Sequence, residues 1–182
     1  MRRWMVSMLL VCTATCDRGE TEAFRPLAAG DAAPAYAAPA LTGDTVALTS
    51  LRGRPVLLNL WATWCPPCRE EMPALQELQE RYGSQGLEVV AVSLDQSADA
   101  AAAFVDPTVN RVVATVAELG LTMSVLHDGT GRVTHTFRTT GVPETFLIDA
   151  DGRIVRRWIG AFDPLADDVI ALVEQTLTSR AR

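Results

Sequence analysis

Two cysteines separated by two prolines, Cys65 and Cys68, stand where a predicted buried strand passes into a predicted helix. Residues 55–62, before the pair, are apolar apart from one asparagine, which is typical of a central strand buried on both faces. From Pro66 to about Arg81, apolar side chains recur at three- and four-residue spacing, and proline suits the first position of a helix. The chain is therefore predicted to place a strand, a cysteine pair and an amphipathic helix in direct succession.

This position favours thiol chemistry. A helix N-terminus presents unpaired backbone N–H groups and the positive end of the helix dipole, so a thiolate there is stabilised and its pKa falls. Cys65 is therefore expected to be an exposed nucleophile at neutral pH. Cys68 follows one helical turn later, close enough to form a disulfide with Cys65 and to release a mixed disulfide.

A Cys-x-x-Cys pair is also half of a four-ligand zinc site. Such a site needs a second Cys or His pair downstream. After residue 68 the sequence has no cysteine, and its two histidines, His127 and His135, have no evident partner. We expect both histidines to be surface or strand residues, and we expect no bound metal.

Composition and charge limit the possible functions. A chain of 182 residues that is 48% hydrophobic and 21% charged can form one domain with a proper core. Its formal net charge of -6 offers no basic surface for phosphates. We therefore expect no nucleic-acid partner.

Residues 1–16 are predicted to be an export signal, because two arginines precede a short apolar stretch over 4–14. A membrane-spanning helix needs ~20 apolar residues, so this stretch is too short for a comfortable span. The small residues before Cys16 resemble a bacterial lipoprotein box, in which that cysteine becomes the lipid-modified N-terminus, although Thr13 and Thr15 depart from the usual residues. An uncleaved anchor, an ordinary signal peptide and a cytoplasmic N-terminus are the alternatives.

Residues 17–33 are polar, rich in alanine and interrupted by Gly and Pro, which indicates a flexible tether. The folded domain is expected over 34–182, on the exported side of the membrane of a bacterial cell envelope. A lipid on Cys16 would anchor it there.

The rest of the chain alternates predicted strands and helices, which indicates an α/β fold with a mixed sheet. Besides the strand and helix at the cysteines, a hairpin is expected near the N-terminus, and two helices are expected between the second and third strands of the sheet. The predicted strands are 37–41, 45–48, 87–94, 123–127, 145–148 and 154–159; the predicted helices are 97–105, 109–119 and one that begins at Asp163-Pro164. The apolar face of the second helix is expected to be Val109, Val112, Val113, Val116 and Leu119.

Two segments, residues 61–73 around the cysteines and 142–145 (Val-Pro-Glu-Thr), resemble the TlpA-like thiol-disulfide oxidoreductases. These are membrane-tethered members of the thioredoxin superfamily and include the ResA- and CcmG-type reductases of cytochrome c maturation. The resemblance covers roughly residues 31–180. It implies a thioredoxin fold, that is, a central mixed sheet flanked by helices, with an N-terminal hairpin and a helical insertion.

The resemblance also implies that the Val142-Pro143 bond is cis and lies against the cysteine pair, where the Val142 backbone can pair with an extended substrate strand. Trp64 would cover the disulfide and supply an apolar contact surface, with core packing as its alternative role. Pro66 and Pro67 would complete this substrate-binding surface.

One position departs from the pattern of thioredoxins, which have a buried Asp six residues before the first cysteine where this chain has Asn59. Asn59 cannot exchange a proton. Glu71 matches an acidic position that TlpA-like reductases use near the active site, and a partly buried carboxylate with a raised pKa can relay the proton of the Cys68 thiol. The alternative for Glu71 is a solvated surface acid, as we expect for Glu70.

The resemblance implies an enzyme that reduces disulfides of other exported proteins, with catalytic residues Cys65, Cys68 and Glu71. It would need no cofactor besides its redox-active disulfide, and an upstream membrane electron donor would re-reduce it. One alternative is a thiol peroxidase, although such enzymes place Thr three residues before the reactive cysteine, where this chain has Ala62. The other is a copper chaperone that binds the metal through its two thiolates.

Overall fold

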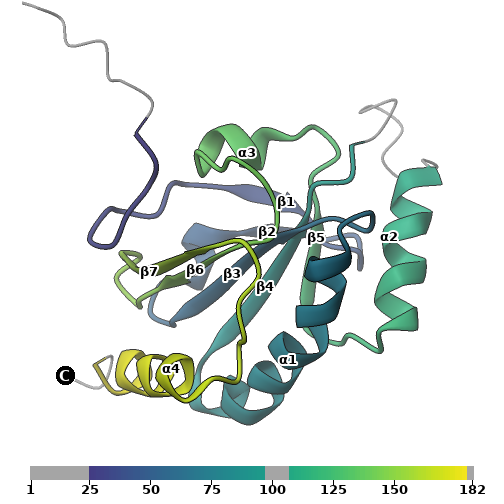
Figure 1. Cartoon of the computed structure of the whole chain (residues 1–182). Coiled ribbons are helices and arrows are strands. Elements are labelled where there is room, and N and C mark those ends of the chain that lie inside the picture. Colours follow the sequence, from purple (N-terminus) through teal and green to yellow (C-terminus); the bar gives the residue numbers. More distant parts are fainter. Residues whose placement is uncertain (1–24, 97–106, 180–182) are drawn as a thin grey trace, which may run out of the picture.

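The computed structural model describes residues 25–96 and 107–179. A five-stranded sheet in the order β5-β4-β3-β6-β7 forms its centre, beside a separate hairpin of β1 and β2 (Figure 1). The strands are β1 (Ala37–Pro39), β2 (Thr45–Ala47), β3 (Val56–Trp61), β4 (Glu88–Ser93), β5 (Ser124–His127), β6 (Glu144–Ile148) and β7 (Ile154–Ile159). The helices are α1 (Pro66–Tyr82), α2 (Pro107–Glu118), α3 (Arg132–Thr136) and α4 (Asp167–Ser179). The predicted α/β class, hairpin and helical insertion between β4 and β5 are confirmed.

Strand β3 lies at the centre of the sheet, and all six of its residues are buried. It runs parallel to β4 and antiparallel to β6, so the sheet is mixed, as expected. An apolar strand without alternation is what burial on both faces requires. The carboxyl end of β3, at Trp61, is followed after a short turn by Cys65 at the start of α1.

Each face of the sheet is covered by its own apolar cluster. Alternate residues of β3 point to opposite faces, so Leu57 belongs to one cluster and Leu58 to the other. Helices α1, α2 and α4 lie on the face of Leu57, whereas α3 and the β1-β2 hairpin lie on the face of Leu58 (Figure 1). The cluster members in or next to these helices and strands include Met72, Leu75, Val112 and Val173 on the first face, and Tyr36, Ala38, Val133 and Phe137 on the second.

Residues 25–33, which the sequence analysis assigned to a flexible tether, contact the folded domain. Leu27 is buried in the second cluster. The N–H of Gly30 donates to the carbonyl of Ile154 at 2.8 Å, and the N–H of Ile154 donates to the carbonyl of Asp31 at 2.9 Å. This segment therefore pairs with the start of the edge strand β7, so the folded domain begins before residue 34.

The last helix begins later than predicted. Asp163 and Pro164 form a separate turn, in which the Asp163 carboxylate accepts the N–H of Leu165 at 2.9 Å, and α4 starts only at Asp167. Because an aspartate side chain can cap a turn as well as a helix, the sequence alone did not separate the two.

Helix α2 packs through most of the predicted apolar face, since Val112 is buried and Val116 and Leu119 pack against the first cluster. Thr108, Val112 and Thr115 are buried, whereas Val113 is 44% exposed. Thr108 and Thr115 lie on the same side of the helix as Val112 and extend the buried face beyond the predicted residues. Helix α3 was not predicted, because five residues are too few for a periodic pattern.

The helix predicted over 97–105 lies outside the described residues. Within residues 25–96 and 107–179, no helix is both long enough and apolar enough to cross a membrane.

Candidate active site

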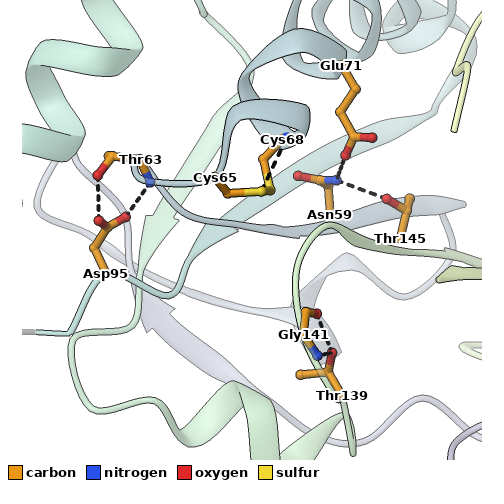
Figure 2. Close-up of a disulfide and its surroundings, with 9 residues drawn as sticks. All are labelled: Asn59, Thr63, Cys65, Cys68, Glu71, Asp95, Thr139, Gly141 and Thr145. Carbon is orange, nitrogen blue, oxygen red and sulfur yellow. Dashed lines mark hydrogen bonds between the residues drawn. A yellow bond between two sulfur atoms is a disulfide. The ribbon is translucent and has the colours of Figure 1, made fainter. Parts of the chain in front are cut away.

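The two cysteines form a disulfide at the N-terminus of α1, where β3 ends (Figure 2). Cys65 is the N-cap residue of the helix, and its Sγ accepts the backbone N–H of Cys68 at 3.3 Å. Pro66 and Pro67 follow at the first helical positions, where a missing N–H leaves no intrahelical bond unmade. The predicted placement of the cysteines between strand and helix is therefore present. A thiolate on Cys65 would accept a hydrogen bond from the N–H of Cys68.

Both sulfurs are more enclosed than expected. Cys68 is fully buried, and Cys65 is only 4% exposed in the disulfide form, so the prediction of an exposed Cys65 does not hold here. Around the disulfide, Trp64 is 65% exposed, which excludes core packing for this side chain, and Pro66 and Pro67 are exposed as well.

The Val142-Pro143 peptide bond is cis, as the resemblance implied. Strand β6 begins at the next residue, Glu144, which is in register with Leu60 of β3. Since β3 ends at the cysteine pair, this register brings Pro143 to the same end of the sheet as the disulfide. Val142 is half-buried. The carbonyl oxygen of Pro143 accepts a hydrogen bond from the N–H of Gly160 at 3.0 Å.

Glu71 lies inside the protein, not on the helix surface: it is 5% exposed. The Nδ2 group of Asn59 donates one hydrogen bond to Glu71 Oε1 at 2.7 Å and another to Thr145 Oγ1 at 2.9 Å (Figure 2). Burial raises the pKa of the Glu71 carboxyl to about 7, although the hydrogen bond from Asn59 and the influence of the Phe162 backbone lower it in part. A carboxyl with this pKa can both accept and release a proton near neutral pH.

A second buried carboxylate, Glu144, was not singled out from the sequence. It is fully buried and forms an ion pair with Arg157 of β7, while its other oxygen accepts the hydroxyl of Thr139. Arg157 also donates to the carbonyl of Leu27 at 2.9 Å. The pair thus fixes the loop before Pro143 and joins it to the N-terminal segment.

A third carboxylate, Asp95, forms hydrogen bonds to Thr63, in the segment between β3 and Cys65. Its oxygens accept the backbone N–H of Thr63 at 2.9 Å, the Thr63 hydroxyl at 2.6 Å and the Ser93 hydroxyl at 2.7 Å (Figure 2). Asp95 is 1% exposed. Its position just after an apolar strand is the one sequence feature that could have identified Asp95 as a residue of the site.

Comparison with known proteins shows the family to which this chain belongs. The sequence model of the AhpC/TSA family matches residues 29–157, more than half of the chain. A thiol-disulfide oxidoreductase ResA of Bacillus cereus is 31% identical over 159 residues, which make up 86% of this chain and 86% of that protein. The chain belongs to the thiol-disulfide oxidoreductases of the thioredoxin superfamily.

Further relatives agree in sequence or in fold. The ResA of Oceanobacillus iheyensis is 38% identical over 129 residues, 69% of this chain, and the match spans 62% of that protein, less than two thirds of its length. A crystal structure from Chlorobium tepidum TLS, described as a thiol:disulfide interchange protein of the thioredoxin family, has a TM-score of 0.65 at 26% identity and covers 84% of this chain and 97% of its own. The thioredoxin fold implied by the resemblance is confirmed.

The two histidines of this oxidoreductase lie in β5 and α3, outside the strand and helix that adjoin the cysteines. His127 is a buried strand residue of β5 whose Nε2 lies 2.7 Å from the carbonyl oxygen of Asp95, so it has a partner that the sequence did not reveal. His135 lies in α3. In the part of the chain that the structure describes, no group of three or more His, Cys, Asp or Glu side chains is arranged to hold a metal ion.

Proposed function

We propose that this protein is an exported, membrane-tethered reductase of disulfides in other exported proteins, such as those of cytochrome c maturation. The observation that carries the proposal is the placement of the Cys65–Cys68 disulfide at a helix N-terminus, at the same end of the sheet as Pro143. The buried Glu71 supplies a group that can take up a proton near pH 7. The ResA name of the relatives supports this class of reaction.

The reaction begins from the reduced protein. The Cys65 thiolate attacks one sulfur of the substrate disulfide, a mixed disulfide forms, and the other substrate sulfur leaves as a thiolate. Cys68 then loses its proton to the Glu71 carboxylate and attacks Cys65. This second attack re-forms the Cys65–Cys68 disulfide and releases the second substrate thiolate. Two electrons have then passed to the substrate, whose thiolates take up protons from Glu71 and from solvent, and an upstream thiol donor must return the two electrons.

The surface around the disulfide suits a protein substrate. Trp64 exposes a large ring, and apolar contact with such a ring binds an unfolded segment without demanding one sequence. The backbone of Val142 can pair with an extended strand of the substrate, as in other cases of strand addition. The proposal needs no cofactor besides the dithiol.

A thiol peroxidase is the second candidate, because the matching family model carries the AhpC/TSA name. Thr63, the threonine nearest to Cys65 in the sequence, donates its hydroxyl to Asp95, so that hydrogen is already engaged. We expect the reduced protein to reduce the disulfides of insulin faster than it consumes hydrogen peroxide at equal concentrations. Stopped-flow measurement of both reactions decides this, and faster reaction with peroxide would overturn the proposed activity.

The tether and its lipid are proposed separately from the chemistry. Cys16 lies outside the described residues, and its role rests on the short apolar stretch and small residues before it. We expect the mature chain in the membrane fraction to begin at Cys16 and to carry lipid. Mass spectrometry of the native protein tests this; an intact Met1, or a soluble mature chain that begins beyond residue 16, would exclude it.

A further inference from the structure

The amide oxygen of Asn59 has no hydrogen-bond partner among the described residues, although the side chain is fully buried. Both hydrogens of its Nδ2 are used, one by Glu71 and the other by Thr145. These two bonds fix the orientation of the amide, so its oxygen must point away from the carboxylate. A buried carbonyl oxygen that lacks a donor costs free energy.

The direction of this oxygen identifies its missing donor. Figure 2 shows the amide of Asn59 between the disulfide and Glu71, with the nitrogen toward the carboxylate and the oxygen toward the sulfurs. Cys68 and Glu71 are three residues apart and therefore share one face of α1. Because Asn59 bonds to Glu71, its amide lies against the face that also carries Cys68.

The two redox states differ in what the sulfurs can donate. In the disulfide, neither sulfur carries a hydrogen, so Asn59 Oδ1 stays without a donor. In the dithiol, Cys65 is at the helix N-terminus and is the sulfur favoured to ionise, whereas the buried Cys68 retains its hydrogen. An S–H group is a weak donor, but it is the donor that appears on reduction.

We propose that Asn59 is a redox-responsive positioning residue, whose Oδ1 accepts a hydrogen bond from the Cys68 thiol in the reduced protein and loses that donor when the disulfide forms. The inference rests on the proposed function only in that the dithiol and the disulfide interconvert. In the dithiol, Asn59 then accepts a hydrogen bond from the Cys68 thiol through its oxygen and donates one to Glu71, the proton acceptor, through its nitrogen.

This contact favours the reduced protein. A hydrogen bond present only in the dithiol stabilises that state relative to the disulfide, so the disulfide of this protein is more readily reduced. Replacing Asn59 with leucine, which is similar in size, removes the oxygen that is unpaired in the disulfide and accepts the thiol hydrogen in the dithiol. We expect the equilibrium with glutathione to move toward the disulfide by about 3- to 10-fold, the size of one net hydrogen bond.

The test uses two readouts that require no protein substrate. The first is the thiol–disulfide equilibrium constant against glutathione for Asn59→Leu, with Asn59→Val as a second variant if leucine is not tolerated. The second is the infrared S–H stretch of Cys68 in a Cys65→Ala background, where this thiol is the one of the pair that remains. Thr145→Val is the matched control, because it removes one acceptor of the amide but leaves its oxygen in place.

Loss of Asn59 is expected to shift the S–H band to higher wavenumber and the equilibrium toward the disulfide, whereas Thr145→Val moves neither. An unchanged band and an unchanged equilibrium constant in both Asn59 variants would overturn the inference, as would a shift of the equilibrium toward the dithiol. Because both readouts are independent of turnover, failure to reduce protein substrates would refute the proposed function without touching this result.

Discussion

Replacing either Cys65 or Cys68 with serine is expected to abolish turnover of protein disulfides, with a loss of ~10³-fold or more. A serine hydroxyl is not ionised near neutral pH and cannot form a disulfide. Each variant therefore lacks one of the two thiolate attacks on which the reaction depends. The measurement is insulin reduction under steady-state conditions with an excess of a small thiol as donor. Residual turnover above one tenth of wild type in either variant would contradict the two-cysteine reaction.

Both serine variants should retain the fold. The disulfide spans three residues and closes a small loop, so its removal changes the entropy of the unfolded chain little. Circular dichroism and thermal unfolding of the reduced wild-type protein beside both variants provide the control. A lost melting transition in a variant would assign its inactivity to misfolding.

Glu71→Gln is expected to slow disulfide reduction by about 10-fold and to alter its pH dependence. General acid–base assistance is worth ~10²- to 10⁴-fold, but thiolate attack itself needs no proton transfer, so the loss falls below that range. In the wild type, the carboxylate that accepts the Cys68 proton forms as the pH rises through about 7, and the resolving step should accelerate over that interval. The glutamine variant should lack this acceleration.

The neighbouring residue offers a matched control for this prediction. Glu70 is exposed at the next position of the same helix, so Glu70→Gln removes the same charge without touching the buried site. Rates of insulin reduction from pH 5 to 9 for both variants and the wild type provide the comparison. An unchanged rate and pH profile in Glu71→Gln would reduce Glu71 to a structural residue.

The same carboxyl links stability to pH. The pKa of Glu71 in the folded protein is raised to about 7, above its ordinary value of 4.5, so the folded state holds this proton more tightly than the unfolded state does. The contribution of Glu71 to the free energy of unfolding is therefore fully present below about pH 4.5 and is lost as the pH rises through 7. Denaturant unfolding at pH 6 and pH 8 should show a larger loss of stability in the wild type than in Glu71→Gln.

The strand, cysteine pair and helix could be predicted from sequence because each depends on local signals. An unbroken apolar run predicts β3, and the prolines and apolar spacing predict α1. Both agree with the structure to within about one residue at the helix end. The cis bond before Pro143 followed from the resemblance to a family rather than from any local pattern.

The contacts that organise the site could not be predicted, because they join residues that are far apart in the sequence. Asn59 and Thr145 are separated by 86 positions and meet because β3 and β6 pair in register. The sequence showed that Asn59 replaces an aspartate, but not that its amide holds Glu71. Glu144 and Asp95 were overlooked for the same reason, since a carboxylate next to an apolar strand gives no local sign of its partner.

The N-terminal boundary was misjudged through composition. Residues 25–33 are rich in alanine and interrupted by glycine and proline, which is typical of a flexible linker. They nevertheless place Leu27 in a core cluster and pair with β7. Pairing through backbone groups depends little on side chains, so it left no trace in the composition.

The central claim is that Cys65 attacks the substrate disulfide and Cys68 resolves the product. Incubating reduced Cys68→Ser with a disulfide-bonded protein, quenching with acid and mapping the adduct by peptide mass spectrometry tests this most directly. We expect a stable mixed disulfide on Cys65, and no such adduct on Cys68 in the reciprocal Cys65→Ser variant. An adduct that forms faster on Cys68 of Cys65→Ser than on Cys65 of Cys68→Ser would contradict the assignment.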